Sequence, residues 1–443
     1  MPRVAHPFLE RPHGTFLSLS FPVLLSLLVE PLAGVADTAF VARLGSVPAA
    51  ALGAATSLLS GFLWVFNFVG IGTQTEVAAA LGRGERNRAA GLAALGLSAA
   101  AACGIVSSVA LWFLAPAAAR FMAAVGELEA PTVAYLRVRL LGVPPTLVVL
   151  AAFGAFRGMQ DMKTPLWIAA FVSGLNICLD PLLIYGSGCV PGLGVAGAAW
   201  ATTASQWLGS FWAVRALRVG LGLAGRFGPG DFLRLLRIGR DLFLRTGMLL
   251  LFLVLATRAA TGIGPETGAA HQAIRQAWIL TALVLDSYAA TAQSLVGFFL
   301  GGGRVREARR AAGIACLWGL LTGAGLSLLM LATGKGVAWL LVPTAAGPVF
   351  FSAWPVAALA QPLNALAFVT DGIHWGASDY GYLRNAMMLA TVVGASMLLA
   401  LEAGGNRDLA AIWWVTAGWI AIRAVSGVGR IWPAFGRAPL AGR

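Results

Sequence analysis

Apolar stretches of about 20 residues or more recur along this chain, separated by short polar segments rich in arginine. Roughly 20 apolar residues are enough to cross a bilayer as a helix. The pattern predicts twelve membrane-spanning helices, several of them long enough to be tilted or kinked. Pro22 and Pro31 in the first helix, and Pro144 and Pro145 in the fourth, are candidate bends. The predicted spans are 15–42, 48–80, 90–117, 131–156, 164–186, 194–216, 236–262, 268–299, 309–332, 344–376, 384–402 and 409–431.

The composition agrees with a membrane protein. The chain is 58% hydrophobic and 11% charged, with a mean hydropathy of +0.80, whereas soluble domains carry about 25% charged residues. The expected fold class is therefore an all-α polytopic membrane protein, with small residues such as its 55 glycines allowing close helix packing. The cysteines show no metal-binding spacing, and no disulfide is expected. They are Cys103, Cys178, Cys189 and Cys316.

The net charge of +13 does not indicate a nucleic-acid partner, because the basic residues lie in short segments between the spans. With both termini placed inside, the inner segments hold 22 lysines and arginines, Arg245 among them. The outer segments hold only Arg43, Arg120, Lys335 and Arg407. This positive-inside asymmetry predicts that both termini are cytoplasmic. The N-terminal segment MPRVAHPFLERPHG then reads as a cytosolic lead-in, not a signal peptide.

An internal repeat relates the two halves. The segment QTEVAAALGRGERNRA from Gln74 recurs 219 residues later as QSLVGFFLGGGRVREA from Gln293. A second set recurs at a shift of 218: Pro144, Gly154, Gly158 and Asp161 match Pro362, Gly372, Gly376 and Asp379. Six spans per repeat keep the orientation of the two halves the same. We therefore expect an N-terminal lobe (1–215), a cytoplasmic linker (216–235) and a C-terminal lobe (236–443).

Acidic residues in the first span suggest a polar interior. Glu30 and Asp37 are seven residues apart, so on a helix they lie on nearly one stripe. An acid at mid-membrane costs about 2.5–3.5 kcal/mol on insertion scales, and such residues usually face a cavity or a partner. The repeat places Ala256 and Leu249 at the equivalent positions of the second half, so these acids are not duplicated there. The first span is typical of a transporter.

A second polar group lies in the fifth span, GLNICLDPLLIYG. Asn176 and Asp180 share a helix face, and Pro181 frees a backbone carbonyl one turn earlier. Together they form an oxygen-rich site able to hold a proton or a small hard cation. Thr202 and Thr203 in the sixth span add hydroxyls. The alternative is that Asp180 ends a helix near the outer surface and is merely solvated.

The stretches EPLAGVADTAFVARLG, GTQTEVAAALGRGERNRA, NICLDPLLIYG and GVAGAAWATTASQ resemble the multidrug and toxin extrusion (MATE) family, and within it the DinF-like branch. The resemblance covers nearly the whole chain. It implies two six-helix lobes around a cleft that opens alternately to each side, with cationic or amphipathic compounds exported in exchange for H⁺ or Na⁺. It also implies coupling residues Asp37, Asn176, Asp180 and Thr202, and a bend at Pro22. The coupling ion is the only cofactor expected.

Two carboxylates brought together repel when both are ionised. Our hypothesis is that external protons, or a sodium ion, neutralise Asp37 and Asp180, bend the first helix near Pro22 and expel the substrate. An inserted loop, SGCVPGLG, leaves the choice between Thr202 and Thr203 open. Glu30 departs from the family pattern and is a candidate for substrate contact or for extra proton storage.

Further cleft candidates follow from polar residues within apolar segments. Asp286 and Asp371 lie in the second half, where other branches use acids for coupling, and a helix-packing role is equally compatible with each. His271 lines the cleft or packs helices. Asn67, beside Trp64 and Phe68, is a candidate contact for an aromatic cation.

Other functions fit less well. A lipid or lipid-linked oligosaccharide flippase of the same superfamily would favour an arginine-lined cavity, for which Arg258 and Arg275 are the candidates. No metal-dependent, nucleophile-base or nucleotide-binding motif is found, so no enzyme activity is expected. We expect a monomer in the bacterial inner membrane whose partners are the bilayer and small amphipathic molecules.

Overall fold

The structure, a computed structural model, describes residues 6–441 except 189, 226, 406, 407, 433–435 and 437. Cys189 and Arg407, used in the cysteine and charge arguments, lie outside the described residues, as do Arg3, Arg226, Arg437 and Arg443. The described cysteines Cys103, Cys178 and Cys316 are free. The chain divides into two compact units, unit 1 (Met1–Ser20 and Arg240–Arg443) and unit 2 (Phe21–Gly239).

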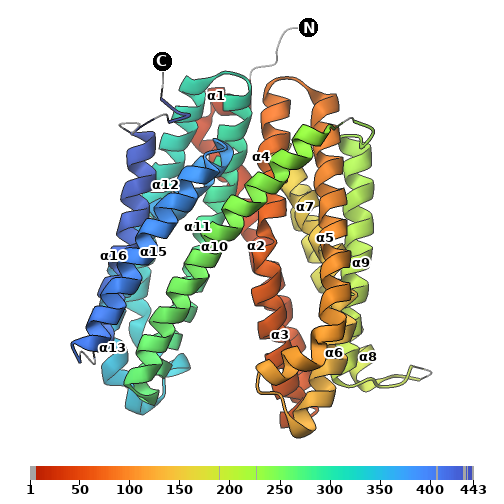
Figure 1. Cartoon of the computed structure of the whole chain (residues 1–443), viewed down its shortest axis with the longest axis vertical. Helices are drawn as coiled ribbons and strands as arrows, with labels where there is room; N and C mark the ends of the chain where they lie inside the picture. Colours follow the sequence, from red (N-terminus) through yellow and green to blue (C-terminus); the bar gives the residue numbers. More distant parts are fainter. Residues whose placement is uncertain are drawn as a thin grey trace. The chain divides into compact units, whose positions relative to one another are not determined.

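The described segments are almost entirely helical (Figure 1). Unit 2 contains most of α2 (Pro12–Ala42) and the start of α10 (Pro229–Ile263). Its other helices are α3 (Ser46–Val65), α4 (Asn67–Gly82), α5 (Arg86–Phe121), η1 (Gly126–Leu128), α6 (Glu129–Leu140), α7 (Val143–Gly158), α8 (Lys163–Tyr185) and α9 (Val195–Gly220). Unit 1 contains α1 (Pro7–Glu10), α11 (Pro265–Gly301), α12 (Val305–Leu341), η2 (Thr344–Ala346), α13 (Gly347–Leu359), α14 (Gln361–Gly376), α15 (Tyr380–Ala403) and α16 (Leu409–Ile431).

The predicted all-helical membrane fold is confirmed. Within the described residues, nine helices are long and apolar enough to cross a membrane, and eleven if each of two bent pairs is one span. One pair, Gly126–Leu140 with Val143–Gly158, bends by 46°, directly before Pro144 and Pro145. The other, Thr344–Leu359 with Gln361–Gly376, bends by 49° beside the repeat-related Pro362. The sixth predicted span is α9, a 26-residue helix that is not among the eleven.

The two repeats fold alike at the places where the sequence repeats. In unit 2, a Cβ added to Gly158 of α7 would lie 2.7 Å from the carbonyl oxygen of Gln74 on α4. In unit 1, a Cβ on Gly376 of α14 would lie 2.5 Å from the carbonyl oxygen of Gln293 on α11. Both distances are shorter than real Cβ contacts, so glycine permits these helix pairs to approach. The repeat is therefore visible in the packing as well as in the sequence.

Unit 1 brings the two chain ends to the same end of its helix bundle (Figure 1). Phe8 of α1 and Phe16 of α2 share one buried apolar cluster with Ile431 and Leu440. The Ser20 hydroxyl donates to Thr291 Oγ1 of α11 at 3.0 Å, which ties the first turns of α2 to this unit. The first helices of the chain and its C-terminal segment thus pack together in one unit.

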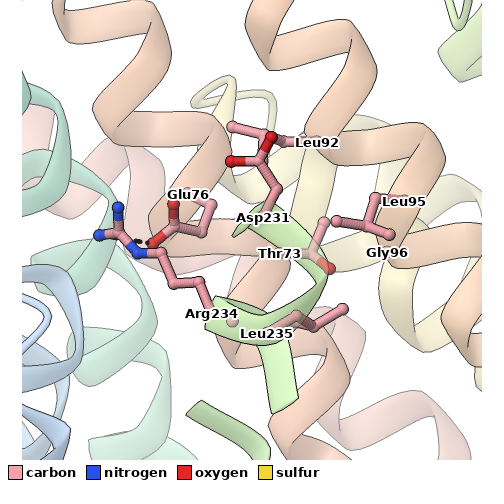
Figure 2. Close-up of a pocket in the computed structure, with 9 residues that line it drawn as sticks. Thr73, Glu76, Leu92, Leu95, Gly96, Asp231, Arg234 and Leu235 are labelled. Atoms are coloured by element: carbon pink, nitrogen blue, oxygen red, sulfur yellow. Dashed lines mark ion pairs between the residues drawn. The ribbon is translucent and has the colours of Figure 1, made fainter. Parts of the chain in front are cut away.

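The predicted linker is held on unit 2. Leu235 and Ile238, in the first turns of α10, are buried and pack at Gly72 of α4. Arg234 forms an ion pair with Glu76 (3.0 Å), beside a small pocket that Asp231 also lines (Figure 2). The C-terminal end of the predicted linker is therefore part of α10 and packs against α4.

Helix α2 is shared between the units. The chain division falls between Ser20 and Phe21, one residue before Pro22. Pro22 and Pro31 both lie inside the helix, where each lacks the backbone N–H of a regular turn. One of the two prolines of α2 therefore lies next to the boundary between the two units.

Candidate functional site

The central polar group of unit 2 lies where α2 and α8 meet. The buried face of α8 is a single stripe that includes Asn176 and Asp180. Asp180 is fully buried, and its carboxyl group lies close enough to the half-buried Asp37 on α2 for the two acids to interact. Among the described residues, no N–H or O–H donor contacts either oxygen of Asp180. Asp180 is therefore not a solvated helix end, and the two acids are adjacent.

Helix α9 supplies the hydroxyl of the group. Asn176 Nδ2 donates to Thr202 Oγ1 at 3.3 Å, and Thr202 donates to the carbonyl oxygen of Ala198 at 3.0 Å. Thr203 instead donates to the carbonyl oxygen of Val138 on α6 at 3.1 Å. Of the two threonines, Thr202 is the one in contact with the amide next to the acid pair.

Two residues of α6 that the sequence analysis did not single out also face the acids. Arg139 lies close enough to Asp37 for a favourable charge interaction, and Tyr135, one turn earlier, is near Arg139 and both acids. Nη1 of Arg139 is buried without a hydrogen-bond partner in the described structure. The signal in the sequence was an arginine and a tyrosine four residues apart inside a predicted span.

Glu30 and Asn67 are not part of this group. Glu30 is exposed on α2, and within the described residues its carboxylate has no hydrogen bond or ion pair. Asn67 is the first residue of α4, and Phe66 separates it from the end of α3. The neighbouring Phe68 ring contacts Gly239 on α10, so this ring packs within the protein.

Unit 1 holds a separate buried ionic cluster. Asp371 on α14 forms ion pairs with Arg423 on α16 (2.8 Å) and with Arg245 on α10. All three residues are buried, and the Arg423 guanidinium lies over the ring of Trp419 at 4.6 Å. Counting Arg245 among the cytoplasmic charges was wrong, because it neutralises a buried acid. Arg423 lies within the last predicted span and was missed.

The remaining candidates of unit 1 are divided between two places. Asp286 on α11 is half-buried and close enough to Arg423 for a charge interaction, so it belongs to the Asp371 cluster. His271, near the start of α11, is buried beside Thr257 and Trp413. His374 on α14 is 1% exposed, and its Nε2 lies within hydrogen-bonding distance (3.1 Å) of the carbonyl oxygen of Gly427.

The acid pair of unit 2 is the arrangement best suited to reversible cation binding. Two adjacent carboxylates with one amide and one hydroxyl can take up protons, and two oxygens without donors leave room for them. Among the described residues, no group of three or more histidine, cysteine or acidic side chains is arranged to hold a metal ion. Asp371, by contrast, already has two cationic partners.

Three comparisons with known proteins relate this fold to a family. The MatE family model matches residues 22–182. Protein DETOXIFICATION 44, chloroplastic, of Arabidopsis thaliana is 32% identical over 431 residues, covering 94% of this chain and 81% of the relative. The DNA damage-inducible protein F of Escherichia coli strain K12 is 26% identical over 446 residues, covering 97% and 94%.

The fold itself matches a solved structure. A crystal structure of MATE in the bent conformation has a TM-score of 0.86 with this chain at 22% identity. The match covers 95% of this chain and 94% of that protein. At this identity the likeness concerns the fold alone.

Proposed function

Because the chain belongs to the multidrug and toxin extrusion (MATE) family of membrane transporters, we propose that it exports cationic or amphipathic compounds in exchange for protons. Members of this family are transporters, not enzymes. The site we assign to coupling consists of Asp37, Asn176, Asp180 and Thr202. Sodium is the second candidate ion, and a bacterial inner membrane is the proposed location.

The observation that carries the proposal is the adjacency of Asp37 and Asp180. Two neighbouring ionised carboxylates repel each other, and the repulsion is strong here because Asp180 is shielded from water. A proton shared by the pair, or one on each acid, removes the repulsion. Arg139 adds a positive charge near Asp37, which stabilises the ionised carboxylate and opposes the binding of any cation there, proton or sodium.

Protonation of the acid pair can affect substrate binding through a bend in α2. Asp37 lies on α2, whose packing changes between units next to Pro22. Drawing Asp37 toward Asp180 when the pair is protonated would pull on α2, and the helix bends most easily at Pro22. We propose that this bend reduces the substrate space and releases the substrate to the outer side. Deprotonation on the inner side then restores the binding state.

Proton release on dye binding tests the proposal directly. Purified full-length protein in weakly buffered detergent solution is titrated with ethidium while a pH indicator reports released protons. An antiporter whose substrate and protons compete releases protons as ethidium binds. We expect this release from the wild type and not from Asp37→Asn or Asp180→Asn.

Glu30→Gln is the matched control, because Glu30 is an exposed acid on the same helix as Asp37. It should release protons like the wild type. Ethidium binding by the wild type without any proton release contradicts the proposed coupling. Release that persists in both Asn variants contradicts the assigned site.

A further inference from the structure

Arg275 is a cation inside a membrane-spanning helix with no acidic partner. It lies on α11, half-buried, and no carboxylate of the described structure forms an ion pair with it. Arg423 and Arg245 are paired with Asp371, and Arg258 lies 3.9 Å from Glu402. Intramembrane charges are usually paired, so an unpaired arginine indicates a missing anionic partner.

The residue next to Arg275 on the same helix face is His271, one turn earlier and 4% exposed. Both contact one hydroxyl: His271 Nε2 lies 3.3 Å and Arg275 Nη1 3.5 Å from Thr257 Oγ1. Thr257 donates its own proton to the carbonyl oxygen of Leu253 at 2.8 Å, so its oxygen accepts from the two nitrogens. Thr257 thus fixes the direction of the arginine and of the imidazole.

Several buried polar atoms around Arg275 have no partner within the described residues. They include Nε of Arg275 itself and Nδ1 of His271. The indole N–H groups of Trp278 and Trp413 also have no acceptor in the described structure. Trp278 is three residues after Arg275 on α11, and the ring centroid of Trp413 is 5.7 Å from that of His271. Buried donors without acceptors are rare because each loses its bonds to water. Nε of Arg275 and the two indole nitrogens are hydrogen-bond donors. Three such donors suit a ligand that is rich in acceptor oxygens.

We propose that unit 1 binds a carboxylate or similar anionic group at Arg275, His271, Trp278 and Trp413. Arginine presents two parallel N–H groups that match the two oxygens of a carboxylate. The indole N–H groups donate further, and the Trp413 ring offers an apolar surface for the rest of the ligand. This inference rests on the proposed export function and specifies its substrates as amphipaths that carry an anionic group, zwitterions included.

Two dyes that differ in one ester separate this proposal from general dye binding. Rhodamine 110 carries a free carboxylate, and rhodamine 123 is its methyl ester. Fluorescence anisotropy measures binding of each to the purified full-length protein. We expect Arg275→Gln to weaken rhodamine 110 binding by about tenfold or more and to leave rhodamine 123 binding within about twofold.

Arg258→Gln is the matched control, since Arg258 is an exposed arginine in the neighbouring helix, and it should change neither affinity. Should Arg275→Gln fail to fold, benzoate competition on the wild type decides: benzoate should displace rhodamine 110 and not rhodamine 123. Equal weakening of both dyes, or no benzoate displacement, overturns the anion site. Wild type that binds only rhodamine 123 overturns it too and leaves the export function standing, whereas binding of neither dye contradicts both.

Discussion

The Arg423 side chain donates to Oδ2 of Asp371 at 2.8 Å, and the two side chains are only 3% and 5% exposed. The same oxygen accepts from Arg245, so a single carboxylate pairs with two buried guanidinium groups. An acid held in this way is a structural counter-ion. Unit 1 therefore does not offer Asp371 as a free site for a coupling cation.

Asp371→Asn should destabilise unit 1 by about 3–5 kcal/mol, because it leaves two buried arginines without their counter-ion. The unfolding transition in detergent, followed by circular dichroism, measures the change. Replacing the exposed Glu30 by Gln serves as a control and should shift the transition little. A stable Asp371→Asn protein with altered ion coupling would show instead that Asp371 takes part in transport.

Thr202 and Thr203 allow a matched test of the hydroxyl in the acid site. Thr202→Val removes the acceptor of Asn176, and leaving that buried amide unpaired costs about 1–3 kcal/mol. We expect Thr202→Val to lower the proton release that accompanies ethidium binding. Thr203→Val loses only its bond to Val138, about 1 kcal/mol of stability, and should keep wild-type release. Loss of release in Thr203→Val alone would transfer the role to that residue.

The repeat-related glycines should respond alike to substitution. Gly158→Ala and Gly376→Ala each place a methyl group against a backbone carbonyl, at 2.7 and 2.5 Å before relaxation. We expect each to destabilise the protein by about 1–3 kcal/mol, measured as thermal unfolding. Gly174→Ala is the control, because its Cβ meets nothing within 4 Å and the change favours the helix. Unchanged stability in either repeat variant would contradict the described packing.

The ion pair between Glu76 on α4 and Arg234 on α10 helps to fix the first turns of α10 against α4 (Figure 2). The Glu76 side chain is 11% exposed and that of Arg234 51%, so the pair contributes about 1 kcal/mol at most. Glu76→Gln should speed amide hydrogen exchange in the first turns of α10. Glu307→Gln, which breaks the contact with Arg304 at the start of α12, should leave that exchange unchanged. Equal exchange rates in both variants would mean that apolar packing alone holds the segment.

Hydropathy was sufficient to predict the fold. Long apolar stretches predicted the spans, and Pro144 and Pro145 predicted the place of a 46° bend. The polar residues of the site were also accessible singly, because Asn176 and Asp180 share a face and Asp37 stands out in an apolar helix, whereas their joint assignment was what the family resemblance implied. These features depend on spacing within one helix, which the sequence displays.

Contacts between different helices could not be predicted from the sequence in the same way. Arg139 faces Asp37, and Arg245 faces Asp371, across residues far apart in the chain. Without the rotation of each helix about its axis, Arg245 looked like a cytoplasmic charge next to the membrane. The partner of a charged side chain is set by packing, and packing required the structure.

Gradient-driven efflux tests the central claim, that Asp37 and Asp180 couple proton entry to export. Wild type and Asp37→Asn are reconstituted in proteoliposomes loaded with ethidium, and efflux is followed under a proton gradient and then under a sodium gradient. The account predicts wild-type efflux driven by the proton gradient alone and lost in Asp37→Asn. Efflux driven only by sodium would contradict proton coupling. Folded wild type that shows no efflux under either gradient would contradict export itself and favour a lipid flippase.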